Sequence, residues 1–127
     1  MPPTQPNTIL IVDDSEEVRS IVRLFLERDA SFEVCGEAAT GQEALQKAQE
    51  LQPDLILLDL KLHGMNGIET AALLRALLPK TKLVLFSAFA EPAGNLWATR
   101  AGIDLVVPKG SLIDMARSLK SLTAHSA

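Results

Sequence analysis

The sequence predicts an α/β protein in which helices cover both faces of a parallel five-stranded sheet, a (βα)5 arrangement. Five short apolar runs alternate with amphipathic helical patterns, without a long linker or an internal repeat between them. Leu, Ala, Ile and Val dominate the composition and aromatic residues make up only 4%, which suits parallel strands buried under helices. The length of 127 residues indicates one domain.

The predicted strands are apolar runs that are too short to be helices. They cover 8–12, 32–38, 54–58, 82–86 and 103–107. A helical pattern follows each of them. Three of these helices are expected over 15–28, from Gly67 to a stop at Pro79, and from Pro92 to a C-cap at Gly102.

Capping boxes predict where the other two helices begin. Thr40 with Glu43 opens the second helix, and Ser111 with Asp114 opens the last one. In the first, second and last helices, apolar residues recur on one face, which is expected to pack on the sheet. These residues are Val18, Ile21, Val22, Phe25, Leu26, Ala44, Leu45, Ala48, Leu51, Ile113, Ala116, Leu119 and Leu122.

The ends of the chain and its charge exclude several classes of protein. The Pro-rich segment 1–7 and the tail 123–127 are expected to be disordered, which leaves one folded domain over 8–122. Neither a secretion signal nor an apolar run long enough to span a membrane is present. A pI near 5.1 gives no general attraction to nucleic acid, so direct binding of DNA by this chain is not expected. The single Cys35 cannot form an internal disulfide, and the default location is the reducing cytoplasm.

Polar residues follow four of the five predicted strands. Asp13 and Asp14 come after the first strand, Asp59 after the third, Ser87 after the fourth and Lys109 close to the end of the fifth. In open α/β sheets, ligands bind beyond the carboxyl ends of the strands. Three converging carboxylates would repel one another unless a cation joined them, and oxygen ligands without His or Cys suit Mg²⁺ or Mn²⁺. With an ammonium and a hydroxyl added, the set could receive a phosphoryl group.

Each of these residues also has an ordinary structural interpretation. Asp13 and Asp14 precede a helix and could simply cap it, as could Ser15. Ser87 could be a strand-end hydroxyl, and Lys109 a solvated surface lysine. Asp59 is harder to dismiss, because a carboxylate that closes a buried strand is poorly placed for capping. Taken together, the four strand ends favour a site.

Four short motifs carry a resemblance to a known family. ILIVDD at 9–14, LILLD at 55–59, FSA at 86–88 and PK at 108–109 together resemble the receiver domains of two-component response regulators. The resemblance extends from about Thr8 to Leu122. It implies a flavodoxin-like fold with the strand order 2-1-3-4-5.

The resemblance also implies a role for each residue of the site. Asp59 would accept a phosphoryl group from a sensor histidine kinase. Asp14, Asp59 and the backbone carbonyl of Lys61 would bind the metal directly, while Asp13 would hold it through water. Ser87 and Lys109 would bind phosphoryl oxygens. Such a domain is a signalling switch and not an enzyme, since it catalyses only its own phosphorylation and dephosphorylation.

The chain departs from the family pattern at three positions. His63 stands where Pro is usual, and is expected to be an exposed loop residue rather than a metal ligand. Val106 replaces the usual Tyr or Phe, which puts the coupling between phosphorylation and output in doubt and makes Phe89 and Trp97 candidates for the mobile packing. Pro108 precedes Lys109, whereas the family usually has Pro directly after this lysine.

Two features of the chain resemble receivers that are attached to helix-turn-helix output domains. The Lys109–Gly110 pair and the run CGEAATG at 35–41 carry this likeness. It implies a DNA-binding output domain outside this chain. A homodimer through the fourth helix, the fifth strand and the fifth helix is a further expectation from the family.

Three other functions compete with a phosphorylation switch. Val106 and Pro108 motivate a pseudo-receiver that binds partners without phosphate. A phosphatase of the haloacid dehalogenase type would need a second acid where Lys61 stands, and a flavodoxin would place a phosphate where Asp13 and Asp14 repel it. The complete set of acids therefore favours the switch.

Overall fold

The computed structural model describes residues 5–62, 66–87 and 102–124. Five parallel strands form one sheet in the order β2-β1-β3-β4-β5, which confirms the predicted α/β class and strand order. The strands are β1 (Asn7–Val12), β2 (Phe32–Ala38), β3 (Leu55–Asp59), β4 (Lys82–Ser87) and β5 (Leu105–Pro108). The described helices are α1 (Glu16–Glu27), α2 (Gly41–Leu51), α3 (Gly67–Leu77) and α5 (Leu112–Ala124). Apart from Gly102, the fourth helix expected over 92–102 lies outside the described residues.

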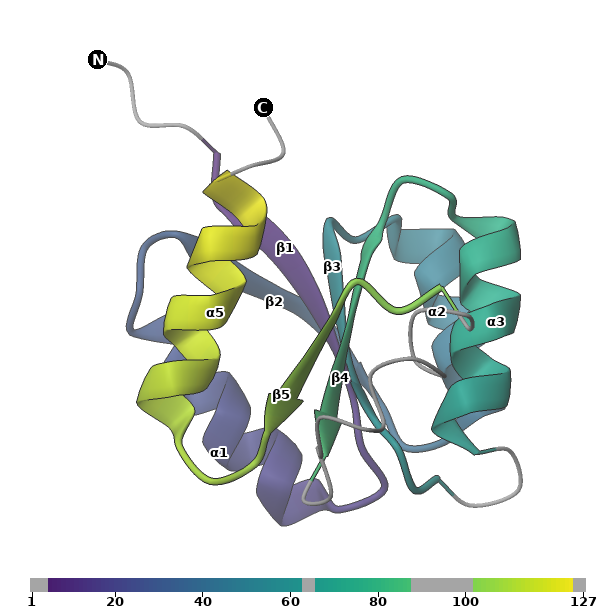
Figure 1. Ribbon diagram of the computed structural model, residues 1–127, viewed down its shortest axis with the longest axis horizontal. Helices are drawn as coiled ribbons and strands as arrows, with labels where there is room; N and C mark the ends of the chain where they lie inside the picture. Colours follow the sequence, from purple (N-terminus) through teal and green to yellow (C-terminus); the bar gives the residue numbers. More distant parts are fainter. Residues whose placement is uncertain (1–4, 63–65, 88–101, 125–127) are drawn as a thin grey trace.

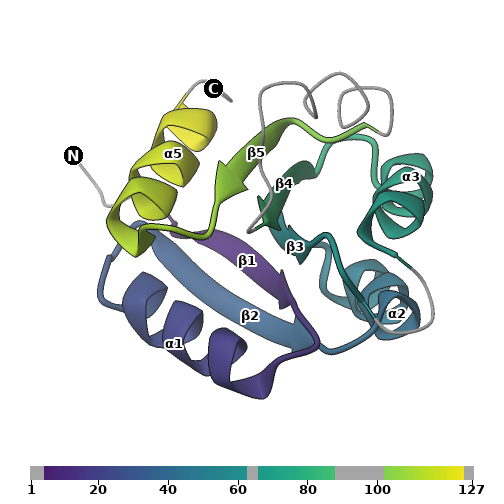
Figure 2. The ribbon, with the colours of Figure 1, turned by 60° about the horizontal axis from the view of Figure 1, so that its bottom comes forward.

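Helices cover both faces of the sheet, with α1 and α5 on one face and α2 and α3 on the other (Figures 1 and 2). Alternate residues of each strand therefore enter two separate cores. In β3, Leu55 and Leu57 pack with α1 and α5, while Ile56 and Leu58 pack in the cluster that includes α2 and α3. All five residues of β3 are buried, as expected for a central parallel strand. None of the helices described here is long and apolar enough to cross a membrane.

The predicted capping residues begin the helices as expected. The Thr40 hydroxyl accepts from the Glu43 N–H at 3.1 Å, and the Glu43 carboxylate accepts from the Ala39 N–H at 2.6 Å. The Ser111 hydroxyl accepts from the Asp114 N–H at 3.2 Å. The bonds to the hydroxyls of Thr40 and Ser111 each satisfy a backbone donor that the first turn of a helix leaves unpaired, while the Glu43 carboxylate reaches back to the residue before the cap.

Three residues predicted to face the core are instead exposed. The exposed fractions are 56% for Ile21, 41% for Leu51 and 61% for Ile113. In α1 the buried stripe runs through Val22 and Leu26, and Ile21 is displaced from Val22 by about 100° around the helix axis. The apolar face that the sequence predicts for α1 is therefore wider than the face that the sheet covers.

The folded segment extends slightly beyond the predicted boundaries of 8–122. Asn7 belongs to β1, because its N–H donates to the Ser31 carbonyl at 2.9 Å. At the other end α5 continues to Ala124, and the Thr123 hydroxyl donates to the Leu119 carbonyl. Asn7 and 123–124 thus belong to a strand and a helix that reach past the expected boundaries.

The start of β5 lies two residues later than predicted, and Arg75 binds the turn that precedes it. Its guanidinium donates to the Gly102 carbonyl from Nε at 3.0 Å and Nη2 at 2.8 Å, and pairs with Asp104 at 2.6 Å. The Asp104 carboxylate in turn accepts from the Leu83 N–H at 2.8 Å. Gly102 has φ +89°, a left-handed conformation that favours glycine, while the helix that it was expected to cap lies outside the described residues. Asp104 is thus joined to β4 twice, because its backbone N–H also donates to the Leu83 carbonyl at 2.8 Å.

Gly67 brings the start of α3 against the end of β3. Its N–H donates to the Leu60 carbonyl at 2.8 Å. A Cβ at this position would meet the Asp59 carbonyl oxygen and would lie 2.8 Å from the Leu60 Cα. Because both obstacles are backbone atoms, a side chain here would displace the segment that follows Asp59.

Replacing this glycine is therefore expected to destabilise the fold. Gly67→Ala should lower the free energy of unfolding by roughly 1–3 kcal/mol, the usual cost of overpacking, measured by urea denaturation. Gly110→Ala is the matched control, because a Cβ there meets nothing within 4 Å and the expected change is within about 0.5 kcal/mol. Equal unfolding midpoints for the two variants would contradict the close approach at Gly67.

Candidate functional site

Residues from three strand ends meet at the carboxyl edge of the sheet. Asp13 directly follows β1, Asp59 closes β3 and Lys109 directly follows β5. The Lys109 Nζ lies 3.0 Å from Asp13 Oδ2 and 3.4 Å from Asp59 Oδ1. Parallel strands place their carboxyl ends at one edge, so residues far apart in the sequence become neighbours here.

The acidic residues form a compact set of oxygen donors. One carboxylate oxygen each from Asp13, Asp14 and Asp59 lies within 4.8 Å of the others. Asp13 and Asp59 are buried, whereas Asp14 is exposed. Oxygen ligands without sulfur or imidazole suit a hard divalent cation, and one exposed member gives a route to solvent. The residues present therefore fit the Mg²⁺ or Mn²⁺ expected from the sequence.

Both carboxylate oxygens, the backbone N–H and the carbonyl of Asp13 all have hydrogen-bond partners. Its Oδ1 accepts from the Ser15 N–H at 2.9 Å and its backbone N–H donates to the Ala38 carbonyl at 3.0 Å. Its carbonyl accepts from Arg19 Nη1 at 2.6 Å. The Ser15 hydroxyl caps α1 by accepting from the Val18 N–H at 3.3 Å. Capping and site formation thus coexist in this turn, with Ser15 as the cap.

The electrostatics of the pocket disfavour a charged Asp59. Burial and the neighbouring negative charge of Asp13 raise the pKa of Asp59, against the opposing influence of Lys109 and the Lys61 N–H. That N–H lies 3.4 Å from Asp59 Oδ1. Two like charges in a buried pocket account for the direction of the shift.

Lys109 is held as a cation by the same carboxylates. Burial alone would lower its pKa, but the hydrogen bond and charge of Asp13, together with Asp59, outweigh burial and raise it. Its ammonium also lies 5.5 Å from the centre of the Phe86 ring, within range of a cation–π contact. Pro108 ends β5 opposite Ser87 and is tolerated because β5 is an edge strand. The unusual proline therefore leaves Lys109 within reach of both acids.

Four residues singled out in the sequence lie wholly or partly outside what the structure describes. His63, Phe89 and Trp97 lie outside the described residues. Ser87 ends β4 beside β3 and β5, but its side chain also lies outside what the structure describes. Val106 packs against the core cluster on the face of α2 and α3, where it offers a small aliphatic side chain.

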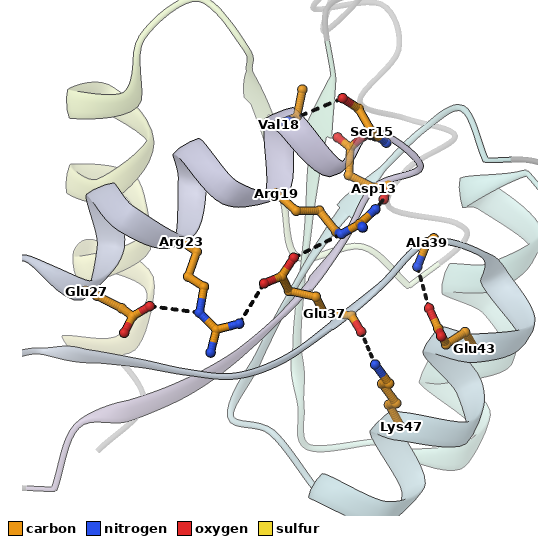
Figure 3. Close-up of polar contacts among 10 residues, drawn as sticks. All are labelled: Asp13, Ser15, Val18, Arg19, Arg23, Glu27, Glu37, Ala39, Glu43 and Lys47. Atoms are coloured by element: carbon orange, nitrogen blue, oxygen red, sulfur yellow. Dashed lines mark hydrogen bonds and ion pairs between the residues drawn. The ribbon is translucent and has the colours of Figure 1, made fainter.

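Sequence reasoning missed a charged network beside the acids, because the second strand was expected to end in nothing reactive. The Glu37 carboxylate near the end of β2 accepts from Arg19 Nε at 3.0 Å and from Arg23 Nη1 at 2.6 Å (Figure 3). Lys47 donates to the Glu37 carbonyl, and Arg23 also pairs with Glu27. Two features of the sequence could have pointed to this network. Glu37 is the one charged residue in the small and apolar run 34–39, and Arg19 and Arg23 are four residues apart, on one face of the first helix.

Comparisons with known proteins agree with this geometry. A family model described as the response regulator receiver domain matches residues 9–120. The response regulator protein VraR of Staphylococcus aureus is 40% identical over 101 residues, which cover 80% of this chain and 48% of VraR. The chain belongs to the response regulator receiver domain family. It spans about half the length of such relatives.

Solved structures of similar fold include regulators with a named output family. A two-component response regulator of the LuxR family from Aurantimonas has a TM-score of 0.89 and 30% identity, covering 94% of this chain and 86% of that one. The receiver domain of the putative response regulator NarL from Mycobacterium tuberculosis has a TM-score of 0.86 and 30% identity, covering 94% and 97%. The predicted likeness to receivers of helix-turn-helix regulators is in keeping with the LuxR-family neighbour.

The raised pKa of Asp59 predicts a stability cost of the ionised site. At neutral pH without divalent cations, Asp59→Asn should raise the free energy of unfolding by on the order of 1 kcal/mol, because it removes one of two buried like charges. A carboxyl whose pKa is raised by folding destabilises the fold above that pKa, so the advantage of the variant should shrink as the pH falls toward and below the pKa of Asp59.

Thermal unfolding from neutral to acidic pH measures this effect. Asp114→Asn, which removes an exposed carboxylate of α5, serves as control and should change stability by less than about 0.5 kcal/mol. An Asp59→Asn protein that is less stable than wild type at neutral pH would refute the electrostatic account.

Proposed function

We propose that this chain is a phosphorylation switch that accepts a phosphoryl group on Asp59 from a phosphohistidine of a sensor histidine kinase. The observation that carries the proposal is the convergence of Asp13, Asp14, Asp59 and Lys109 at one edge of the sheet. Acids and an ammonium from separate strands have little structural reason to be buried together, since their assembly costs stability at Asp59. Membership of the receiver family supports the same function.

A divalent cation, Mg²⁺ or Mn²⁺, would be held by Asp14, Asp59 and the Lys61 backbone carbonyl, with Asp13 bound through water. When bound, it would neutralise the carboxylates and the incoming phosphoryl oxygens. The donor set supports this assignment because it consists of oxygen atoms alone.

The chain's own residues would share the remaining steps. A carboxylate oxygen of Asp59 forms the new bond to phosphorus as the bond to the kinase imidazole breaks, and the imidazole nitrogen keeps the electron pair. Lys109 would pair with one phosphoryl oxygen and Ser87 would donate to another. Lys109 suits this role because Asp13 and Asp59 keep it charged.

The product would act as a signal and not as a released compound. Phosphorylation places added negative charge and strong acceptor oxygens at the strand ends, where a shift of nearby elements can expose a different surface. Val106 offers no ring to turn inward, so the coupling is expected to use other packing. The site is therefore proposed to serve signalling in the cytoplasm, with no turnover of an external substrate.

The output is proposed to lie outside this chain. The LuxR-family structural neighbour and the extra length of VraR support an attached DNA-binding domain. A homodimer through the fourth helix, β5 and α5 remains a proposal from the family. Neither proposal requires this chain itself to bind nucleic acid.

Phosphorylation by a small donor tests the switch directly. With acetyl phosphate and Mg²⁺, the intact mass of the wild type should increase by one phosphoryl group. Asp59→Asn should abolish the adduct, since no acceptor remains, and chelation of the divalent cation should suppress it. Beryllofluoride with Mg²⁺ should likewise stabilise the wild type and not the variant.

Asp54→Asn is the matched control, because Asp54 precedes β3 and lies at the opposite edge, where it accepts from the Thr8 N–H. It should be phosphorylated like the wild type. Wild-type protein that binds Mg²⁺ but gains no adduct from acetyl phosphate or a phosphorylated kinase would favour the pseudo-receiver instead.

A further inference from the structure

Arg19 bridges the acidic site and the end of a neighbouring strand. The Nε–H of its guanidinium donates to the Glu37 carboxylate at 3.0 Å. Its Nη1 donates to the Asp13 carbonyl oxygen at 2.6 Å (Figure 3). The Arg19 side chain is only 15% exposed, so these bonds form largely away from water.

The Asp13 carbonyl needs this donor because α1 does not supply one. The helix begins at Glu16, and its first intrahelical bond joins the Arg19 N–H to the Ser15 carbonyl at 3.0 Å. Asp13 is only 3% exposed, so water cannot readily replace a lost partner. An unpaired carbonyl at this depth would be costly, and Arg19 satisfies it from one turn into the helix.

Glu37 fixes where the guanidinium lies. Its carboxylate binds Arg19 through Oε1 and Arg23 through Oε2, while Lys47 binds its carbonyl. Burial favours the neutral form of Glu37, but the hydrogen bonds from Arg23 and Arg19 outweigh it, so its pKa is lowered and it is ionised at neutral pH. Without this anchor, the guanidinium could pair with the carboxylates of the acidic site itself.

The bond to the Asp13 carbonyl has a geometric consequence for Asp14. The Asp13 C=O and the Asp14 N–H and Cα lie in one rigid peptide plane. Holding the carbonyl therefore sets the orientation of this plane, and with it the position of the Asp14 N and Cα from which the side chain starts. Asp14 is the exposed member of the acidic set, whereas Asp13 and Asp59 are confined by burial.

We propose that Arg19, anchored by Glu37, is a positioning residue that orients Asp14 for a divalent cation by fixing the Asp13–Asp14 peptide plane. The inference rests on the proposed function, since it assigns a supporting residue to the proposed metal site. The side-chain bonds described for Arg19 go to the Glu37 carboxylate and to the Asp13 carbonyl oxygen. Arg19 acts through the backbone of its neighbours.

Arg23 provides a matched control within the same network. It lies one turn further along α1 and binds the same Glu37 carboxylate, at 2.6 Å. It also binds the Glu27 carboxylate at 2.8 Å, which lies one turn further toward the C-terminal end of α1 and away from the acidic turn (Figure 3). Arg23→Met therefore removes an ion pair of Glu37, whereas Arg19→Met also removes the donor to Asp13.

Calorimetric titration with Mg²⁺ is the primary measurement. Arg19→Met should raise the dissociation constant for Mg²⁺ about tenfold, the usual scale for residues that orient metal ligands. Arg23→Met should change it less than about twofold even where it lowers the melting temperature as much. With acetyl phosphate, Arg19→Met should need more Mg²⁺ for half-maximal phosphorylation, while the rate at saturating Mg²⁺ stays near that of the wild type.

A second pair of variants tests whether Arg19 and Glu37 act as a unit. Glu37→Gln should weaken Mg²⁺ binding less than Arg19→Met, and the double variant should be no weaker than Arg19→Met alone. Should Arg19→Met fail to fold, Arg19→Lys and Glu37→Gln replace it in the test, and their dissociation constants for Mg²⁺ are compared with that of Arg23→Met. Lysine keeps the charge but cannot span both acceptors, so binding must still be weaker than in Arg23→Met.

The outcomes separate the two proposals. Mg²⁺ affinity unchanged in the Arg19 variants, or equally weakened in Arg23→Met, would overturn the positioning role and leave the phosphorylation switch intact. A wild type that neither binds Mg²⁺ nor becomes phosphorylated would overturn both.

Discussion

The repulsion between two buried carboxylates governs the carboxyl edge of this sheet. Asp13 follows β1 and Asp59 ends the neighbouring β3. Burial and the negative charge of Asp13 raise the pKa of Asp59, so the edge would be unfavourable without compensating donors. Lys109 bridges both acids, and the Ser15 and Lys61 N–H groups point at them. The surrounding structure is arranged to tolerate concentrated negative charge, and the same arrangement would attract a divalent cation and a phosphoryl group.

The opposite edge of the sheet is built differently, because its charges are used in closed pairs. Asp54 accepts from the N–H and hydroxyl of Thr8. Arg75 binds both the Asp104 carboxylate and the Gly102 carbonyl in the turn before β5. These contacts connect neighbouring strands, and the charged groups of Asp54, Arg75 and Asp104 all have partners. The amino ends of the strands are thus joined by paired charges, whereas at the carboxyl ends stability is given up to hold the acids of the proposed site.

The network around Glu37 shows how the second type of edge depends on residues that carry no chemistry themselves. Asp13 offers a carboxylate to the site and a buried carbonyl to Arg19, so its side chain and backbone are oriented by different partners. Such support comes from α1 and β2, which contribute no acid to the cluster. Metal sites generally rely on groups of this kind to hold their ligands.

The sequence by itself determined the fold class, the strand order implied by the family motifs, and the acids and lysine at the strand ends. Alternating apolar runs leave few ways to bury a parallel sheet, and polar residues that end such runs must share one edge. Tertiary structure decided which apolar residues stay exposed, as at Ile21, where the stripe covered by the sheet is narrower than the apolar spacing. It alone also revealed the bond from Arg19 to the Asp13 carbonyl. A backbone acceptor has no letter in the sequence, so its partner can be recognised only when the two groups are seen together in space.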